Sequence, residues 1–292
     1  MTSNASPREL TLAVRGMQLS ALAFGDPSRP LLLALHGWMD NAASFVPLAP
    51  HLTSHYVVAL DLPGHGRSSH RPEGCAYFHA DYALDVAHAA QTLGAERFAL
   101  LGHSMGGGIA TLVAAAHTDA VSQLIIIDGL GPYVEPADNT ARQLGRAITQ
   151  SLRPASPPRR YASLDALLAR RAETSSDIDR AALKLIVERN AREQKDEQGQ
   201  PYWHWTTDPR LKQASPTRLT PEAALNLVGS IEAPVLNLVA SRGMSKQFPL
   251  MRERESALIN GRTDVIDGHH HLHLDGAVDE TAAAINAFLE AS

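Results

Sequence analysis

The stretch of sequence that decides the fold runs from Phe98 to Ala110 and reads Phe-Ala-Leu-Leu-Gly-His-Ser-Met-Gly-Gly-Gly-Ile-Ala. Its first four residues are apolar and predict a buried strand, and the residues from Met105 onward predict a helix. Gly102 and Gly106 lie two positions before and after Ser104, so the chain can turn sharply there and hold the serine in a strained backbone conformation. The alternative is a glycine-rich turn with an idle serine. The sharp turn favours a serine hydroxyl that is exposed for nucleophilic chemistry.

Other short runs are also almost wholly apolar, namely Leu31 to Leu35, Tyr56 to Leu60, Leu124 to Ile127 and Val235 to Ala240. Continuous apolarity over this length is typical of parallel strands that are covered on both faces. Residues 9 to 24 alternate around Gly16 and predict an antiparallel hairpin, and Ala80 to Leu93 has the apolar spacing of a helix. Strands that alternate with helices predict an α/β fold with a doubly wound, mostly parallel sheet.

This alternation stops between Gly131 and about Ala233, in a stretch that is rich in Pro, Arg, Ala and Glu. Helical segments are predicted near residues 139–152, 163–171 and 177–194, with an exposed turn at 193–200 and no obvious buried strand. We therefore expect a core formed by residues 1–131 and 233–292, with a helical cap inserted as residues 132–232. Asp279 to Leu289 predicts a closing amphipathic helix.

The composition limits the kinds of partner. The chain has 292 residues, of which 44% are apolar, and a formal net charge of -5. This length fits one large α/β domain, or a core domain with an inserted subdomain. The mild negative charge gives no reason to expect binding to nucleic acid or to an anionic membrane surface.

The cysteine content and the N-terminal residues indicate the cellular setting. Cys75 is the only cysteine, so no intrachain disulfide and no thiolate metal cluster is expected. Met1 to Leu10 is polar and lacks the layout of an export signal, and no apolar run approaches membrane-spanning length. We therefore expect no membrane insertion and a reducing, cytoplasmic location.

A serine hydroxyl needs a base to take its proton, and a histidine-rich loop can supply one. The loop follows the strand-like residues 263–266 and contains His269, His270, His271 and His273. The carboxyl ends of the strands in an open α/β sheet form one rim, so this loop lies on the same rim as Ser104. The same histidines with Asp275 or Asp267 could bind a metal, but adjacent residues on an extended loop point in different directions and rarely converge on one ion. We expect no metal and no cofactor.

A histidine base also needs a carboxylate that fixes its tautomer. Asp128 directly follows the apolar run 124–127, the next predicted strand after the one that leads to Ser104. An aspartate before Gly129 is often only a turn-forming or helix-capping residue. With Ser104 and the histidine loop on the same rim, the catalytic role is favoured, and Asp264 and Asp267 are the alternatives.

The oxyanion that forms when a serine attacks a carbonyl needs backbone N–H donors. One candidate is the amide of Met105, at the start of the predicted helix. The other is the amide of Trp38, in the loop His36-Gly37-Trp38-Met39-Asp40 that follows an apolar run. The Trp38 ring can pack on a pocket wall at the same time. The segment 61–68, Asp-Leu-Pro-Gly-His-Gly-Arg-Ser, is interpreted as a structural turn without chemistry.

Taken in order, these motifs resemble the α/β-hydrolase fold superfamily over nearly the whole chain. They are His36-Gly37, the segment 61–68, Gly102-His103-Ser104-Met105-Gly106-Gly107 and the late histidine. Within that superfamily, the sequences of residues 36–42 and of residues 202–210 are similar to those of the serine hydrolase-like proteins.

The resemblance implies which histidine is the base. Members commonly place it five residues before an acidic residue, in a Gly-x-His-His-x-His pattern, and this selects His270, with His269 as the runner-up. The commonest position for the acid, the loop Ala240 to Ser245, holds no carboxylate here. Some dehalogenases and lipases of the superfamily take their acid after the strand that follows the nucleophile, where Asp128 stands.

The expected function is a serine hydrolase of small to medium carboxylic esters, thioesters or lactones that works through an acyl-enzyme with Ser104, His270 and Asp128. A carbon–carbon bond hydrolase or perhydrolase would use the same triad, and an inactive ligand-binding protein on the same scaffold is the third alternative. Dehalogenation is disfavoured, because it needs a carboxylate where Ser104 stands. The aromatic residues Tyr202, Trp203 and Trp205 either line an acyl site or form the core of the cap.

Overall fold

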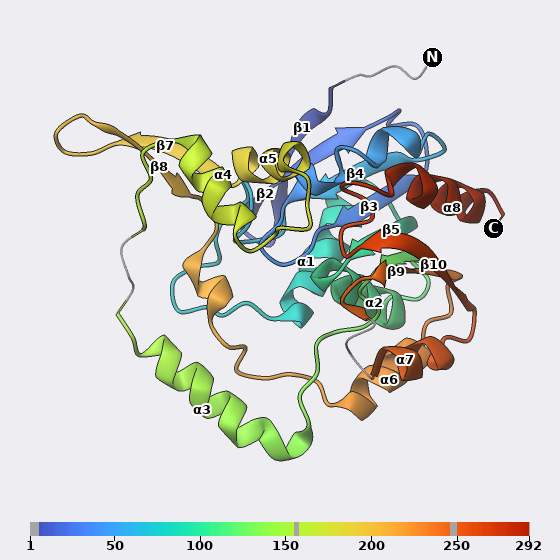
Figure 1. The fold of residues 1–292 in the computed structure, drawn as a ribbon. Helices are drawn as coiled ribbons and strands as arrows, with labels where there is room; N and C mark the ends of the chain where they lie inside the picture. Colours follow the sequence, from blue (N-terminus) through green and yellow to red (C-terminus); the bar gives the residue numbers. More distant parts are fainter. Residues whose placement is uncertain (1–5, 155–157, 246–249, 292) are drawn as a thin grey trace.

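The structure is a computed structural model that describes residues 6–154, 158–245 and 250–291. In this part of the chain, eight strands form one sheet in the order β1-β2-β4-β3-β5-β6-β9-β10 (Figure 1). Their bounds are Arg8–Val14 (β1), Met17–Phe24 (β2), Leu31–Leu35 (β3), Tyr56–Leu60 (β4), Phe98–His103 (β5), Val121–Ile127 (β6), Val235–Arg242 (β9) and Gly261–His269 (β10). The antiparallel pairings in this sheet are β1 with β2 and β2 with β4, and its other pairings are parallel. The predicted mostly parallel α/β sheet is confirmed.

Central strands of the sheet such as β3 and β4 are buried on both faces, which explains why they are continuously apolar. In β3, Leu33 and Leu35 belong to one apolar core, and Leu32 and Ala34 belong to the other. The helices α1 (His79–Thr92) and α2 (Met105–Ala116) pack into the first core. The helix α8 (Val278–Glu290) packs into the second. Each fully buried aliphatic side chain in these cores contributes about 1.5–3 kcal/mol to the hydrophobic driving force for folding.

The helix α2 approaches the sheet so closely that only glycine fits at its start. A Cβ atom on Gly106 would lie 2.0 Å from the backbone oxygen of Leu35, and one on Gly107 would lie 2.5 Å from that of Gly129. These contacts are with backbone, which cannot move aside as a flexible side chain can. The glycines after Ser104 therefore set the distance between α2 and the carboxyl ends of β3 and β6.

An insertion separates β6 from β9. It contains the helices α3 (Thr140–Ser151), α4 (Leu164–Ala172), α5 (Arg180–Arg189) and α6 (Pro221–Gly229), and a hairpin of β7 (Ala191–Lys195) and β8 (Pro201–Trp205). Figure 1 shows α3 set apart from the sheet and the hairpin projecting from the fold. The helices α4 and α5 form an apolar cluster of their own, against which Trp203 and Trp205 pack. These two aromatic side chains are thus part of the insertion's core.

The predicted helix 177–194 is wrong at its C-terminal end. The helix α5 ends at Arg189, and the residues from Ala191 pair with Trp205 and its neighbours as a strand. Asn190 marks the break, because its side chain accepts a hydrogen bond from Gly66 N at 2.9 Å and donates one to Met39 O at 3.2 Å. The predicted turn at 193–200 accordingly begins inside β7, and only the residues between the two strands form it.

Two further helices were not predicted, α6 and α7 (Leu250–Ala257). They pack against each other, and α6 also packs against α2, although it lies within the segment predicted as the cap. The boundaries 132 and 232 of the insertion remain a prediction. In the described ranges every helix is too short or too polar to traverse a bilayer.

Candidate active site

Ser104 occupies the turn between β5 and α2 in a backbone conformation that L-residues rarely adopt, with φ 51° and ψ -115°. Such strain costs about 1–3 kcal/mol and persists only where the surroundings enforce it. Gly129 is one of these constraints, since a Cβ there would lie 2.5 Å from Ser104 Cα. The serine hydroxyl makes no capping hydrogen bond to α2. The turn therefore presents a hydroxyl group that the helix does not use.

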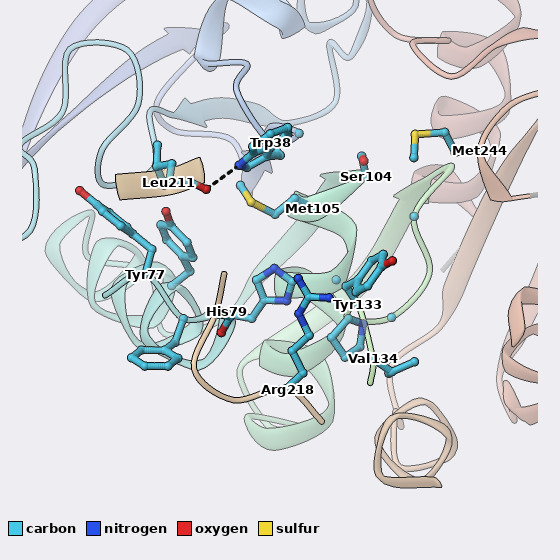
Figure 2. A pocket seen from close by; sticks show the side chains of 18 of the residues that line it. Trp38, Tyr77, His79, Ser104, Met105, Tyr133, Val134, Leu211, Arg218 and Met244 are labelled. Carbon is cyan, nitrogen blue, oxygen red and sulfur yellow. Dashed lines mark hydrogen bonds between the residues drawn. The ribbon is translucent and has the colours of Figure 1, made fainter. Parts of the chain in front are cut away.

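Ser104 lies in the wall of a cavity of about 1720 Å³. The wall also includes Trp38, Met105, Asp128 and His270, so the structure brings all five predicted site residues to one cavity. Figure 2 shows Ser104, Met105 and Trp38 in this wall. The indole Nε1 of Trp38 donates a hydrogen bond to the carbonyl oxygen of Leu211 in the insertion, at 3.2 Å. The half-exposed ring of Trp38 is therefore tied to the insertion at the pocket wall.

Asp128 and His270 are hydrogen-bonded to each other. His270 Nδ1 lies 2.6 Å from Asp128 Oδ2, and Asp128 follows β6 with a positive φ of 46°. The carboxylate also accepts hydrogen bonds from the backbone amides of Ala240, at 3.2 Å, and Met244, at 2.8 Å. The loop that lacks a carboxylate of its own therefore supplies donors to Asp128. A Cβ on Gly243 would lie 2.3 Å from Asp128 Oδ2, so only glycine fits at this position of the loop beside the carboxylate.

The surroundings of Asp128 favour its charged form. Burial alone raises the pKa of a carboxyl group, but the hydrogen bond and the charge of His270 act in the opposite direction. A hydrogen bond from Ser245 and the amide of Ala240 add to that effect, and the pKa of Asp128 is lowered below its ordinary value. Asp128 is therefore ionised at neutral pH and can orient His270 through Nδ1, which directs Nε2 away from the acid.

The neighbouring histidines have other partners. His269 Nε2 lies 3.0 Å from Asp275 Oδ1, and its Nδ1 accepts the backbone N–H of His271 at 3.1 Å. His273 is fully buried against Phe45, with ring centroids 4.9 Å apart. The structure thus distinguishes His270 from His269 by their acidic partners.

The alternative acids near the histidine loop lie outside the cavity. Asp267 is exposed and binds Ser241 and Arg242, and Asp264 pairs with Arg262 on the same strand. Asp61, which was interpreted as structural, accepts hydrogen bonds from the amides of Ala42 and Arg67 and is fully buried.

One buried cluster was missed at the sequence level. Arg171 of α4 donates to Asp40 Oδ1 at 2.9 Å, and His271 Nε2 lies 3.4 Å from Asp40 Oδ2. Burial raises the pKa of Asp40, but the hydrogen bond and charge of His271 and the charge of Arg171 outweigh it, so the pKa is well below the usual range. His103 Nε2 donates to the carbonyl oxygen of His270 at 3.0 Å. This cluster ties the insertion to the backbone of the histidine loop.

In the described ranges, two groups of side chains have the spacing of metal ligands. They are Asp40 with His103 and His271, and Asp177 with His269 and His271. The His103 pKa is held well below its ordinary value by burial and by the neighbouring histidines His273, His270 and His271. His103 is therefore neutral at pH 7. Asp40, His103 and His271 all lie in motifs named above, but their partner Arg171 is 131 positions away from Asp40 along the chain, so no motif indicated the cluster as a whole.

Comparison with known proteins identifies the family of the chain. The family model for the alpha/beta hydrolase fold matches residues 30–272. A probable serine hydrolase of Drosophila melanogaster is 30% identical over 97% of this chain and 87% of its own length. A serine hydrolase-like protein of Danio rerio is 26% identical over 99% of this chain and 90% of its own.

Solved structures show the same fold. The crystal structure of a hypothetical protein from Pseudomonas aeruginosa PAO1 matches with a TM-score of 0.88 and 40% identity, over 98% of this chain and all of the other. The thioesterase domain from the curacin biosynthetic pathway matches with a TM-score of 0.81 at 21% identity, over 99% of this chain and all of the other, which shows the fold alone. The predicted resemblance is confirmed: the chain belongs to the α/β-hydrolase fold family, and among its members it resembles the serine hydrolase-like proteins.

Proposed function

We propose that this hydrolase-family protein cleaves small to medium carboxylic esters through an acyl-enzyme, with Ser104 as nucleophile, His270 as base and Asp128 as the acid that orients it. The observation that carries the proposal is the 2.6 Å contact between Asp128 and His270 Nδ1 in the cavity that Ser104 also lines. A carboxylate on Nδ1 leaves Nε2 as the nitrogen that takes a proton.

The reaction proceeds in two halves. Ser104 Oγ attacks the ester carbonyl carbon while His270 Nε2 takes its proton, and the backbone amides of Trp38 and Met105 hold the resulting oxyanion. Met105 is the first residue of α2, where backbone N–H groups have no partner within the helix. The leaving alkoxide departs with the proton from His270. Water, activated by the same histidine, then releases the acid from Ser104.

Other acyl substrates fit the same groups. Thioesters and lactones react by the same steps, and a carbon–carbon bond hydrolase or perhydrolase would use the same triad. A 2-(acetamidomethylene)succinate hydrolase of Mesorhizobium japonicum is 38% identical over 37% of this chain. A Burkholderia fluoroacetate dehalogenase is 42% identical, also over 37%. Ser104 stands where dehalogenation needs a carboxylate nucleophile, so an acyl substrate is the better proposal.

The alternative is a catalytically inactive protein that binds a ligand on this scaffold. The strained turn at Ser104 argues against it, because strain is retained where the surroundings and the chemistry require it. The paired, ionised Asp128 argues in the same direction.

The test is hydrolysis of short-chain p-nitrophenyl esters by the wild type, by Ser104→Ala and by Ser230→Ala, a control at an exposed position. We expect Ser104→Ala to lose at least about 10⁴-fold in kcat/KM and Ser230→Ala to match the wild type. Equal rates for the wild type and Ser104→Ala would reject Ser104 as the nucleophile, and absence of any turnover would favour the inactive scaffold.

A further inference from the structure

The cavity wall has a charge that differs from that of the whole chain. The formal net charge of the protein is -5, but among the described residues the wall has more cationic than acidic side chains. The cationic ones are Arg146, Arg171, Lys212, Arg218 and Arg254, and the acidic ones are Asp40, Asp81 and Asp128. A cleft of one sign concentrates ligands of the opposite sign.

The acidic side chains of the wall already have cationic or histidine partners. Asp40 binds Arg171, Asp128 binds His270, and Asp81 lies 3.8 Å from Arg15. They therefore offset little of the remaining positive charge, although Glu135, 3.7 Å from Arg218 Nη1, offsets part of it.

Arg254 is also held by the protein itself. Its guanidinium donates to the carbonyl oxygens of Leu130, at 2.8 Å, and Pro132, at 2.7 Å. Within the described part of the chain, the side chains of Arg146, Lys212 and Arg218 make no hydrogen bond, and Arg218 is placed by its contacts with Tyr133 and Glu135.

Arg218 is held by stacking on Tyr133 and by a long ion pair with Glu135. Its Cζ atom lies 4.4 Å from the centre of the Tyr133 ring, and its Nη1 lies 3.7 Å from Glu135 Oε2, beyond hydrogen-bonding distance. Figure 2 shows the Arg218 side chain reaching up between His79 and Tyr133 at the cavity. Stacking on a ring face fixes the guanidinium plane and leaves its N–H edge for a carboxylate, which it can bind through two parallel hydrogen bonds.

His79 adds a neutral imidazole to this end of the cavity. Burial, and then the charge of Arg218, lower the pKa of His79 to about 4. The imidazole therefore carries no charge at neutral pH, and the positive charge belongs to Arg218. Met105 also lines the cavity, and Figure 2 shows its side chain near Trp38, above His79. An acyl chain with an apolar middle and an anionic end matches a wall that contains both the apolar Met105 side chain and the cationic Arg218.

We propose that Arg218, stacked on Tyr133 and beside His79, binds a carboxylate at the far end of the acyl group, so that the preferred substrates are monoesters of dicarboxylic acids. The proposal rests on the proposed esterase function for its kinetic consequences, but carboxylate binding at Arg218 does not depend on catalysis. A cavity of about 1720 Å³ exceeds the roughly 300–1,000 Å³ that small ligands usually occupy. It therefore has room for an acyl chain that extends beyond the ester group.

The first experiment measures binding of glutarate to the wild-type protein by calorimetry at low ionic strength. Glutarate is the acid product of such a substrate, so the result is independent of whether Ser104 is active. We expect Arg218→Met to weaken binding by about tenfold to hundredfold, as the loss of a charged hydrogen-bonded contact does, and Arg218→Lys to weaken it less. The matched control is Arg142→Met, which removes an arginine of α3 that does not line the cavity.

The second experiment compares kcat and KM for p-nitrophenyl hydrogen glutarate and p-nitrophenyl butyrate. We expect Arg218→Met to raise KM for the charged ester by at least about tenfold, with a much smaller change for the uncharged ester. Added salt should reduce the difference. Circular dichroism of each variant checks that it is folded.

The outcomes separate the two proposals. If the wild type hydrolyses neither ester but binds glutarate through Arg218, the esterase function fails and the carboxylate site stands. If glutarate does not bind, or Arg218→Met binds it as the wild type does, the carboxylate site is rejected whatever the rate of ester hydrolysis. Equal losses in Arg218→Met and Arg142→Met would also reject it, because they indicate a general effect of charge.

Discussion

The helices α2 and α3 both contain glycine, but for different reasons. In α2, Gly106 faces the backbone of Leu35 at a distance that admits no side chain. In α3, Gly145 has nothing within 4 Å of where its Cβ would be. The residues around it are also exposed, with Ile148 at 50% and Leu152 at 79%. The first helix is fixed by contacts with the sheet, and the second tolerates change.

This difference suggests that the sheet and α2 position the catalytic groups, whereas the insertion selects the substrate. The sheet and α2 determine where Ser104, Asp128 and His270 lie relative to one another. The insertion, through side chains such as Arg218, forms the distant wall of the cavity. We infer that substitutions at the carboxyl ends of the strands alter the reaction itself, whereas substitutions in the insertion alter which substrates are accepted.

The largest contrast is expected between two identical substitutions. Gly106→Ala places a methyl group 2.0 Å from the Leu35 carbonyl oxygen, so we expect the protein to fail to fold or to lose more than about 3 kcal/mol in unfolding free energy. Gly145→Ala in α3 should gain roughly 0.5–1 kcal/mol, because alanine favours helix more than glycine does. Urea unfolding measures both, and similar effects at the two positions would remove the distinction between the helices.

The next contrast lies within the histidine loop. His270→Ala removes the imidazole that contacts Asp128, and we expect a loss of about 10⁴-fold or more in kcat. His269→Ala removes the partner of Asp275 and should retain activity within about tenfold. Steady-state kinetics with a p-nitrophenyl ester decides between them. A dead His269→Ala beside an active His270→Ala would show that the other histidine is the base.

The two aspartates that contact these histidines give a third comparison. Asp128→Asn keeps the shape of the side chain but cannot hold the correct tautomer of His270, so we expect kcat to fall by about 10³–10⁴-fold with normal folding. Asp275→Asn should change kcat by less than about tenfold, since its partner is His269. A loss below about tenfold in Asp128→Asn would mean that another acid supports the base.

The smallest expected effect is a dependence of stability on pH. Burial, followed by the charge of His36, lowers the pKa of His65 to about 3. The unfolded chain therefore binds a proton at pH 6 that the folded protein excludes. The unfolding free energy is therefore unaffected by His65 protonation above about pH 6.5. As the pH falls toward 3, the unfolding free energy decreases by about 1.4 kcal/mol per pH unit for each such histidine.

The prediction can be checked with the midpoint of urea unfolding at several pH values between 8 and 5. We expect the stability to fall with acidity and His65→Phe to reduce the slope by about one proton equivalent. The pKa of Asp128 is lowered, so its own contribution disappears only at pH values below the ordinary carboxyl range. An unchanged slope in His65→Phe would show that His65 is not the group that resists protonation.

Much of the core could be predicted from the sequence because its signals are local. The strands around Ser104 are continuous apolar runs, and the turn needs adjacent small residues, so a short window contains both. The end of α5 could not be predicted in this way. Ala191 to Lys195 consists of residues that favour helix, but Asn190 binds Gly66 and Met39, and the segment pairs with β8. Long-range contacts override local propensity here.

The candidate site could also be predicted from the sequence only in part. Residue motifs indicated Ser104, Trp38 and Asp128, but the choice among consecutive histidines depended on a resemblance and not on local chemistry. The pairing of Asp40 with Arg171, and the position of Arg218 between Tyr133 and His79, depend on how distant segments pack. No local pattern in the sequence specifies such contacts.

The most direct test of the central claim is mass spectrometry of the protein after reaction with a fluorophosphonate probe. We expect one adduct on Ser104 in the wild type, a much slower reaction in Asp128→Asn and none at that residue in Ser104→Ala. A wild-type protein that remains unlabelled at Ser104, or carries its adduct on a different residue, would contradict the account.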